Sequence, residues 1–256
     1  MVPPMSSPDP GGETDFGFQQ VPLDEKQHLV RRVFEAVAPR YDLMNDLMSG
    51  GVHRLWKAEM IRWLRPRPRQ TLLDVAGGTG DVAERFLNAA GAGATAILCD
   101  INRAMVEAGR DRAIDRGRVG DILWICGDAE ALPVASASVD AVTIAFGLRN
   151  VTRIDAALAE MRRVLRPGGR FCCLEFSHVE QPMLARLYDL YSFNVLPRLG
   201  QVVAGDRDAY QYLVESIRRF PPQRELSERM AAAGFEQVRF RNLSGGIAAL
   251  HSGWRL

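Results

Sequence analysis

One stretch of this chain combines residue types that suit a ligand carrying both positive and negative charge. Asp74 lies in a short apolar run, glycines follow at positions 77, 78 and 80, and Asp81 opens an amphipathic helix pattern. Glycines lack a Cβ, so their backbone can approach a ligand closely. The free N–H groups at a helix start favour negative charge. Asp74 adds an anion that can receive an ammonium group, so a nucleotide-like ligand with an amino group and a carboxylate fits this stretch.

Two classes of cofactor use such a stretch. Residues 78–83 (GTGDVA) match the dinucleotide fingerprint, and Asp100 follows Gly80 by 20 positions (100 − 80), where a ribose-binding acid is expected. S-adenosylmethionine folds use the same strand, turn, helix and acid. Asp74 favours them, because a carboxylate ahead of the glycines would repel a pyrophosphate. A purely structural glycine turn is the third interpretation.

The surrounding sequence predicts the elements that position these residues. Helical patterns, among them 102–116 and one starting at Thr152, separate near-continuous apolar runs at 71–75, 94–100, 122–126, 139–146 and 171–176. This alternation indicates a parallel sheet covered on both faces. Residues 237–243 and 247–254 read as a closing hairpin. We therefore predict an α/β fold with a doubly wound, mostly parallel seven-stranded sheet.

Four polar residues fall at or just after the carboxyl ends of predicted strands. They are Asp74, Asp100, Asp128 and Arg149. Ligands of such sheets bind outside the carboxyl ends of the strands, near the switch point of the strand order. We expect these four side chains to form one site.

The domain organisation is expected to be simple. Residues 1–20 are predicted to be a flexible N-terminus, and 21–256 a single domain. Within it, 21–68 holds two amphipathic helix patterns ahead of the first strand, a natural helical lid over the site. Residues 178–222 interrupt the strand–helix alternation and are predicted to be a substrate-side insertion.

Composition excludes several classes of protein. A hydrophobic content of 47% is ordinary for a soluble globular chain, and a formal net charge of +1 argues against a nucleic-acid partner. No apolar run is long enough to span a bilayer, and the start lacks the features of a targeting segment. The four cysteines and four histidines form no metal-ligand spacing, so no metal site is expected. These features favour the cytoplasm.

Several sequence blocks resemble the ubiquinone/menaquinone biosynthesis C-methyltransferases, which belong to the class I, Rossmann-like S-adenosylmethionine-dependent methyltransferases. The likeness extends over nearly the full length of the chain. Its blocks are 41–56 (YDxMNxxMSxxxHxxW), 74–81 (DVAGGTGD), 146–151 (FGLRNV), 163–169 (RVLRPGG), 175–177 (EFS) and 210–217 (YQYLVESI). The chain has Ala145 where the family often has serine.

The resemblance implies a methyl transfer from S-adenosyl-L-methionine to a ring carbon of a polyprenylated quinol. The acceptor would be 2-methoxy-6-polyprenyl-1,4-benzoquinol, demethylmenaquinol, or both. The implied cofactor-binding residues are the loop residues Gly77, Gly78 and Thr79, then Asp100 on the ribose hydroxyls, and Asp128 with Ala129 at the adenine edge.

The expected catalytic residues are Arg149, Asn150 and Tyr41. Arg149 and Asn150 would position a water or the phenolate, and Tyr41 of the lid block would help to order it. The other interpretation of Arg149 is a structural ion-pair partner. The prenyl tail would need an apolar channel, for which the candidates are Met44, Leu47, Met48, Leu187, Tyr191 and Val195. Peripheral contact with the inner face of the cell membrane, a quinone biosynthesis complex and a homodimer stay open as partners.

Three other functions compete with carbon methylation. An NAD-type oxidoreductase is favoured only by the dinucleotide fingerprint. A non-catalytic S-adenosylmethionine-binding component of a quinone biosynthesis complex would bind the cofactor without transferring its methyl. An O-methyltransferase would act on the hydroxyls of the same quinols.

Overall fold

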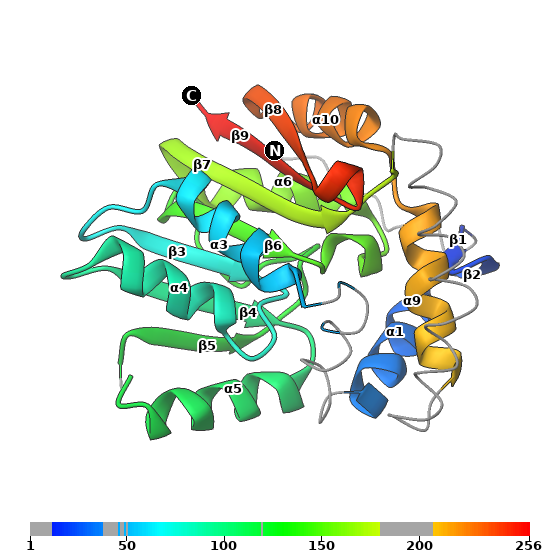
Figure 1. Cartoon of the computed structure of the whole chain (residues 1–256), viewed down its shortest axis with the longest axis horizontal. Helices are drawn as coiled ribbons and strands as arrows, with labels where there is room; N and C mark the ends of the chain where they lie inside the picture. The colour runs from blue at the N-terminus through cyan, green and yellow to red at the C-terminus, as the bar shows by residue number, and fades with distance from the viewer. Residues whose placement is uncertain (1–11, 38–45, 47–48, 50, 119, 180–206) are drawn as a thin grey trace, which may run out of the picture.

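The computed structural model describes residues 12–37, 46, 49, 51–118, 120–179 and 207–256. Its centre is a seven-stranded sheet with the strand order β5-β4-β3-β6-β7-β9-β8 (Figure 1). Five strands run parallel: β3 (Thr71–Val75), β4 (Thr95–Asp100), β5 (Ile122–Cys126), β6 (Val139–Ala145) and β7 (Leu165–Phe176). The closing hairpin of β8 (Glu236–Leu243) and β9 (Ala248–Arg255) joins antiparallel to β7.

Helices cover both faces of this sheet, as the alternation of apolar runs predicts. One face carries α3 (His53–Leu64), α4 (Asp81–Ala90) and α5 (Arg103–Asp115), and the other carries α6 (Ile154–Val164) and α10 (Gln223–Ala232). Neighbouring strand residues point to opposite faces, so Leu72 enters the first core and Leu73 the second. The predicted doubly wound, mostly parallel fold is confirmed.

Three elements cluster at the end of the sheet where the parallel strands terminate. They are the hairpin of β1 (Glu13–Phe16) and β2 (Gln19–Pro22), α1 (Leu23–Val37) and α9 (Arg207–Arg219) (Figure 1). Phe16 stacks on Tyr212 with ring centroids 4.2 Å apart, and the backbone N–H of Phe18 donates to Glu215 at 3.0 Å. Aromatic stacking and this hydrogen bond therefore tie the hairpin to α9.

Residues 13–20 are not a flexible start but belong to the β1–β2 hairpin. Residues 207–219 of the inserted segment form α9. Residues 167–169 lie inside β7, whose pairing with β6 is irregular between Val139 and Ala141. The remainder of the inserted segment, 180–206, and most of the block 38–50 lie outside the described residues.

Candidate functional site

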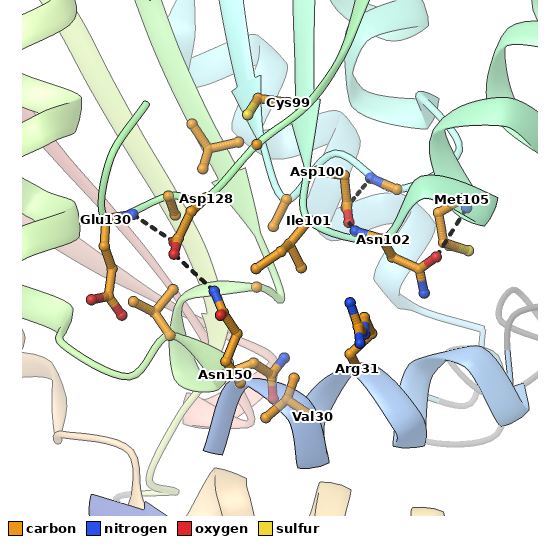
Figure 2. A pocket seen from close by; sticks show the side chains of 18 of the residues that line it. Val30, Arg31, Cys99, Asp100, Ile101, Asn102, Met105, Asp128, Glu130 and Asn150 are labelled. Carbon is orange, nitrogen blue, oxygen red and sulfur yellow. Dashed lines mark hydrogen bonds between the residues drawn. The ribbon is translucent and has the colours of Figure 1, made fainter. Parts of the chain in front are cut away.

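A concave site lies at the carboxyl ends of β3, β4 and β5, under α1. It contains about 850 Å³ of empty space, open solvent at its mouth included. Main-chain turns after three strands and the loop after β6 form its walls, and α1 closes one side (Figure 2). We call this space the main pocket. The residues around it include Asp100, Ile101, Asn102, Met105, Asp128, Ala129, Gly78, Phe146, Asn150, Gln27, Val30 and Arg31.

Asp100 holds two turns of the main pocket together. Its Oδ2 accepts the N–H of Gly78 at 2.8 Å, and its Oδ1 accepts the N–H of Asn102 at 2.8 Å. Burial raises the pKa of this carboxyl, while the two backbone donors act in the opposite direction. The spare lone pairs of the carboxylate can still accept hydroxyl groups.

Asn102 leaves one polar group without a partner next to this carboxylate. Its Oδ1 caps α5 by accepting the N–H groups of Ala104 and Met105. Its Nδ2 is buried and has no hydrogen-bond partner among the residues that the structure describes. Figure 2 shows Asn102 beside Asp100, with Arg31 of α1 across the pocket. An orphaned donor on a pocket wall is the kind of group that a bound ligand satisfies.

Asp128 connects the turn after β5 with α1. Its Oδ1 accepts the N–H of Glu130 at 2.9 Å, and its Oδ2 accepts Nε2 of Gln27 at 2.8 Å. Ala129 lines the pocket beside it. Gln27 lies on α1 and is not among the site residues predicted from the sequence. A glutamine on the polar face of an amphipathic helix cannot be distinguished by sequence from an ordinary solvated residue. The helix α1 therefore closes directly onto the pocket.

A smaller cavity of about 380 Å³ of empty space adjoins the glycine turn, and Gly78 lines both spaces. We call it the loop cavity. Gly77, Thr79 and Asp74 line it as well, whereas Asp128 lines the main pocket. A Cβ on Gly77 would come within 2.8 Å of Oδ2 of Asp74, which explains the glycine there.

Asp74 is fully buried beneath the turn. Its Oδ1 accepts the hydroxyl of Thr143 at 2.7 Å, and its Oδ2 has no hydrogen-bond partner in the described part of the chain. Burial raises the pKa of Asp74 to about 7, against the opposing effects of Thr143 and Lys57. A ligand ammonium group next to Oδ2 would satisfy this atom and favour the ionised carboxylate.

Arg149 does not line the main pocket. It is buried, and its Nη1 donates to Glu175 at 2.9 Å and to the carbonyl of Phe146. The guanidinium also lies 5.5 Å from the ring centroid of Phe176. The structure thus places Arg149 in a buried ion pair, the second of the two interpretations offered above.

Asn150, next in the chain, does line the main pocket. Its Oδ1 accepts the hydroxyl of Tyr212 on α9 at 3.1 Å. Burial raises the pKa of this phenol. Tyr212 belongs to a block quoted for the family resemblance, but its place beside Asn150 depends on the packing of α9 and could not be read from the sequence. Tyr41 and the six channel candidates lie outside the described residues.

No group of three or more histidine, cysteine, aspartate or glutamate side chains within the described part of the chain could hold a metal ion. None of the helices that the structure describes is both long and apolar enough to cross a bilayer.

Solved structures share this fold at low sequence identity. A S-adenosylmethionine-dependent methyltransferase from Thermotoga maritima, described as a possible histamine N-methyltransferase, aligns with a TM-score of 0.62 and 20% identity. The alignment covers 89% of this chain and all of that one (100%). Similarity at this level establishes the class I methyltransferase fold and nothing about the substrate.

Sequence comparison gives the family. A protein of Paracoccus denitrificans (strain Pd 1222) is 60% identical over 251 residues, 98% of this chain and 100% of that one. A protein of Rhodopseudomonas palustris (strain HaA2) is 58% identical over 252 residues, 97% of this chain and 99% of that one. Both are named ubiquinone/menaquinone biosynthesis C-methyltransferase UbiE. The model of the ubiE/COQ5 methyltransferase family matches residues 21–255, which include the sheet and the main pocket. The chain therefore belongs to the ubiE/COQ5 methyltransferase family.

Proposed function

We propose that this methyltransferase carries a methyl group from S-adenosyl-L-methionine to a ring carbon of a polyprenylated quinol. The acceptor is 2-methoxy-6-polyprenyl-1,4-benzoquinol, demethylmenaquinol, or both. The observation that carries the proposal is the convergence of Asp100, Asp128 and the glycine turn on connected cavities under a lid helix, in a chain of this family.

The residues present fit the cofactor. Nδ2 of Asn102 is a buried donor without a partner among the described residues, and Oδ2 of Asp74 is a buried acceptor without one. At Gly77 there is no room for a Cβ, so its backbone stays open to a ligand. As the family resemblance implies, Asp100 would hold the ribose hydroxyls, and Asp128 with Ala129 would hold the adenine edge. Gly77, Gly78 and Thr79 would contact the cofactor from the glycine turn. When bound, the cofactor supplies an electrophilic sulfonium methyl.

The acceptor carbon sets the chemical demand on the protein. A quinone ring is electron-poor, so the reduced quinol is the form that can react. Loss of a proton from a ring hydroxyl directs electron density to the neighbouring carbon, and a polar group must order the water or phenolate involved. Asn150, fixed by Tyr212, is the described side chain best placed for this role, with Tyr41 as its proposed partner.

Arg149 is then a positioning residue in this proposal. Its ion pair with Glu175 fixes the short helical turn η2 (Leu148–Asn150), which carries Asn150 at the edge of the pocket. The positive charge behind Asn150 also stabilises a developing phenolate. Arg149 itself does not serve as the base, because a guanidinium stays protonated.

The wider organisation is proposed from the same resemblance. Residues 21–256 form one methyltransferase domain, with 21–68 as its lid and 178–222 on the substrate side. A substrate dissolved in the bilayer implies contact with the inner face of the cell membrane or with a quinone biosynthesis complex. A homodimer is compatible with either.

Product analysis tests the function. Purified protein is incubated with isotope-labelled S-adenosylmethionine and each demethylated quinol under reducing conditions, and the product is examined by NMR. We expect the label on a ring carbon. Label on oxygen would indicate an O-methyltransferase. Cofactor binding without labelled product would favour a non-catalytic component, and thermal stabilisation by NAD alone would favour an oxidoreductase.

Proton linkage at Asp74 gives a prediction. With a pKa of about 7, much of this carboxyl is protonated below neutral pH, and the cofactor ammonium favours its ionised form. As the pH increases toward 7, affinity for S-adenosylhomocysteine should therefore increase by up to about tenfold per pH unit, and above pH 7 it should level off. Calorimetry in buffers of different ionisation enthalpy should show proton release at about pH 6, and none in Asp74→Asn.

The same carboxyl affects the stability of the ligand-free protein with the opposite sign. Its folded-state pKa lies above the unfolded value, so the folded state holds more protons between about pH 4 and 7. The contribution of Asp74 to stability is full below its unfolded pKa and is lost as the pH rises through 7. Asp74→Asn should remove that slope in urea unfolding. An unchanged slope in the variant would contradict the assignment of this pKa.

A further inference from the structure

Lys57 is a buried lysine on α3, and neither the sequence motifs nor the proposed function assigns it a role. It is 7% exposed and lines the loop cavity together with Asp74, Gly77 and Thr79. Its Nζ donates to Oδ2 of Asp81 at 3.0 Å. A buried ammonium group carries a large desolvation cost, so its position at a cavity wall calls for a reason.

Its pairing with Asp81 does not account for all of its hydrogen-bonding capacity. An ammonium group has three donors, and the bond to Asp81 uses one of them. Asp81 has a second cation of its own, because Nε of Arg85 donates to its other oxygen at 2.7 Å. Asp81 therefore keeps a partner if Lys57 turns part of its charge toward the cavity.

The lining of the loop cavity also includes the carboxyl group of Asp74. Oδ2 of Asp74 is buried and lacks a hydrogen-bond partner within the described ranges. Lys57 is close enough to lower the pKa of Asp74 by its charge. The cavity also adjoins the start of α4, where Gly80 takes a left-handed conformation and no side chain caps the helix. Free N–H groups at this helix start add to the positive side.

A cation and an unpaired carboxyl oxygen on the lining of one cavity match the two charges of an α-amino acid. We infer that Lys57 binds the carboxylate of the amino-acid end of S-adenosylmethionine, while Asp74 receives its ammonium group. The inference rests on the proposed cofactor. It makes α3, a helix that packs on the sheet, part of the binding site.

The helix α3 also supports a wall of the main pocket. Trp56, adjacent to Lys57, packs against Phe146 and Phe176 at centroid distances of 6.3 and 5.9 Å. Phe146 lines the main pocket. A carboxylate held by Lys57 would therefore fix the helix that supports the Phe146 side of this pocket. Lys57 is a positioning residue in this account.

Ligand truncation combined with mutation tests the inference. Calorimetry compares S-adenosylhomocysteine with its decarboxylated form, which keeps the adenosine, the sulfur and the ammonium group. In Lys57→Met, affinity for S-adenosylhomocysteine should fall about 10- to 100-fold, the loss expected for one charge-assisted hydrogen bond. Affinity for the decarboxylated form should fall much less, because that ligand offers Lys57 no carboxylate and loses only what a higher pKa of Asp74 in the variant takes from its ammonium group. Lys57→Arg should recover part of the loss.

Arg85→Met is the matched control. It removes the other cationic partner of Asp81, but Arg85 does not line the loop cavity. A merely structural role of the Lys57–Asp81 pair predicts similar losses in both variants and for both ligands, and that result would overturn the inference. Equal affinity of the wild type and Lys57→Met for S-adenosylhomocysteine would also overturn the inference about Lys57. The proposed function would not be affected by that result. Wild-type protein that binds neither ligand would contradict the proposed function itself.

Discussion

Replacing Arg149 by methionine should destabilise the protein by about 3–5 kcal/mol, because Glu175 would be left buried without its cation. Both side chains are 1% exposed, and the pair is 2.9 Å apart. Burial already raises the pKa of Glu175 even with the arginine present, so its charge depends on this partner. For a chain of this size the loss corresponds to a decrease in Tm of about 10 °C or more. Urea unfolding at pH 7 measures it.

A second variant separates the structural role from a role in the reaction. Arg149→Met combined with Glu175→Gln removes the uncompensated charge and should recover at least half of the lost stability. If this double variant is stable, binds S-adenosylhomocysteine and yet fails to methylate quinol, the positive charge behind Asn150 acts in the reaction. Near-normal methylation would reduce Arg149 to its ion pair. A single variant as stable as the wild type would contradict the buried pair itself.

Replacing Asp100 by alanine should weaken binding of S-adenosylhomocysteine at least about 100-fold, the loss of two hydrogen bonds to a charged acceptor. The carboxylate is proposed to hold both ribose hydroxyls, and it also fixes Gly78 and Asn102 from the two sides of the pocket. Losing it therefore removes ligand contacts and loosens two turns at once. Calorimetry with S-adenosylhomocysteine gives the affinity directly.

Asp121→Ala is the control for this variant. Asp121 precedes β5 at the opposite end of the sheet and pairs with Arg118. We expect wild-type affinity from it. Thermal unfolding of both variants checks that they are folded. A loss of affinity of less than about threefold in folded Asp100→Ala would be smaller than the loss expected for one such hydrogen bond. That result would remove Asp100 from the ribose site.

The sheet and the cofactor turn could be predicted because local sequence determines them. The run at 71–75 is apolar and short, glycines follow, and Asp81 begins a helix, so strand, turn and helix all follow from neighbouring residues. Asp100 and Asp128 could be placed in one site because parallel strands bring their carboxyl ends to one edge. Their convergence needs the topology but no detail of side-chain packing.

The β1–β2 hairpin and the side-chain contacts of α1, α3 and Arg149 could not be predicted in the same way. The strands 13–16 and 19–22 carry few apolar residues, and they are held by contacts with α9, almost 200 positions further along the chain. The pairing of Arg149 with Glu175 joins two different strand ends through a side-chain rotamer that no spacing reveals. Gln27 and Lys57 belong to amphipathic helices, where burial or exposure of a polar residue depends on what the helix packs against.

A crystal structure with bound S-adenosylhomocysteine tests the central claim most directly. The account predicts the ribose hydroxyls within hydrogen-bond distance of Asp100, the adenine beside Asp128 and Ala129, and the amino-acid end in the loop cavity between Asp74 and Lys57. An adenosine moiety located away from Asp100 and Asp128 would contradict the account, whatever activity the protein shows.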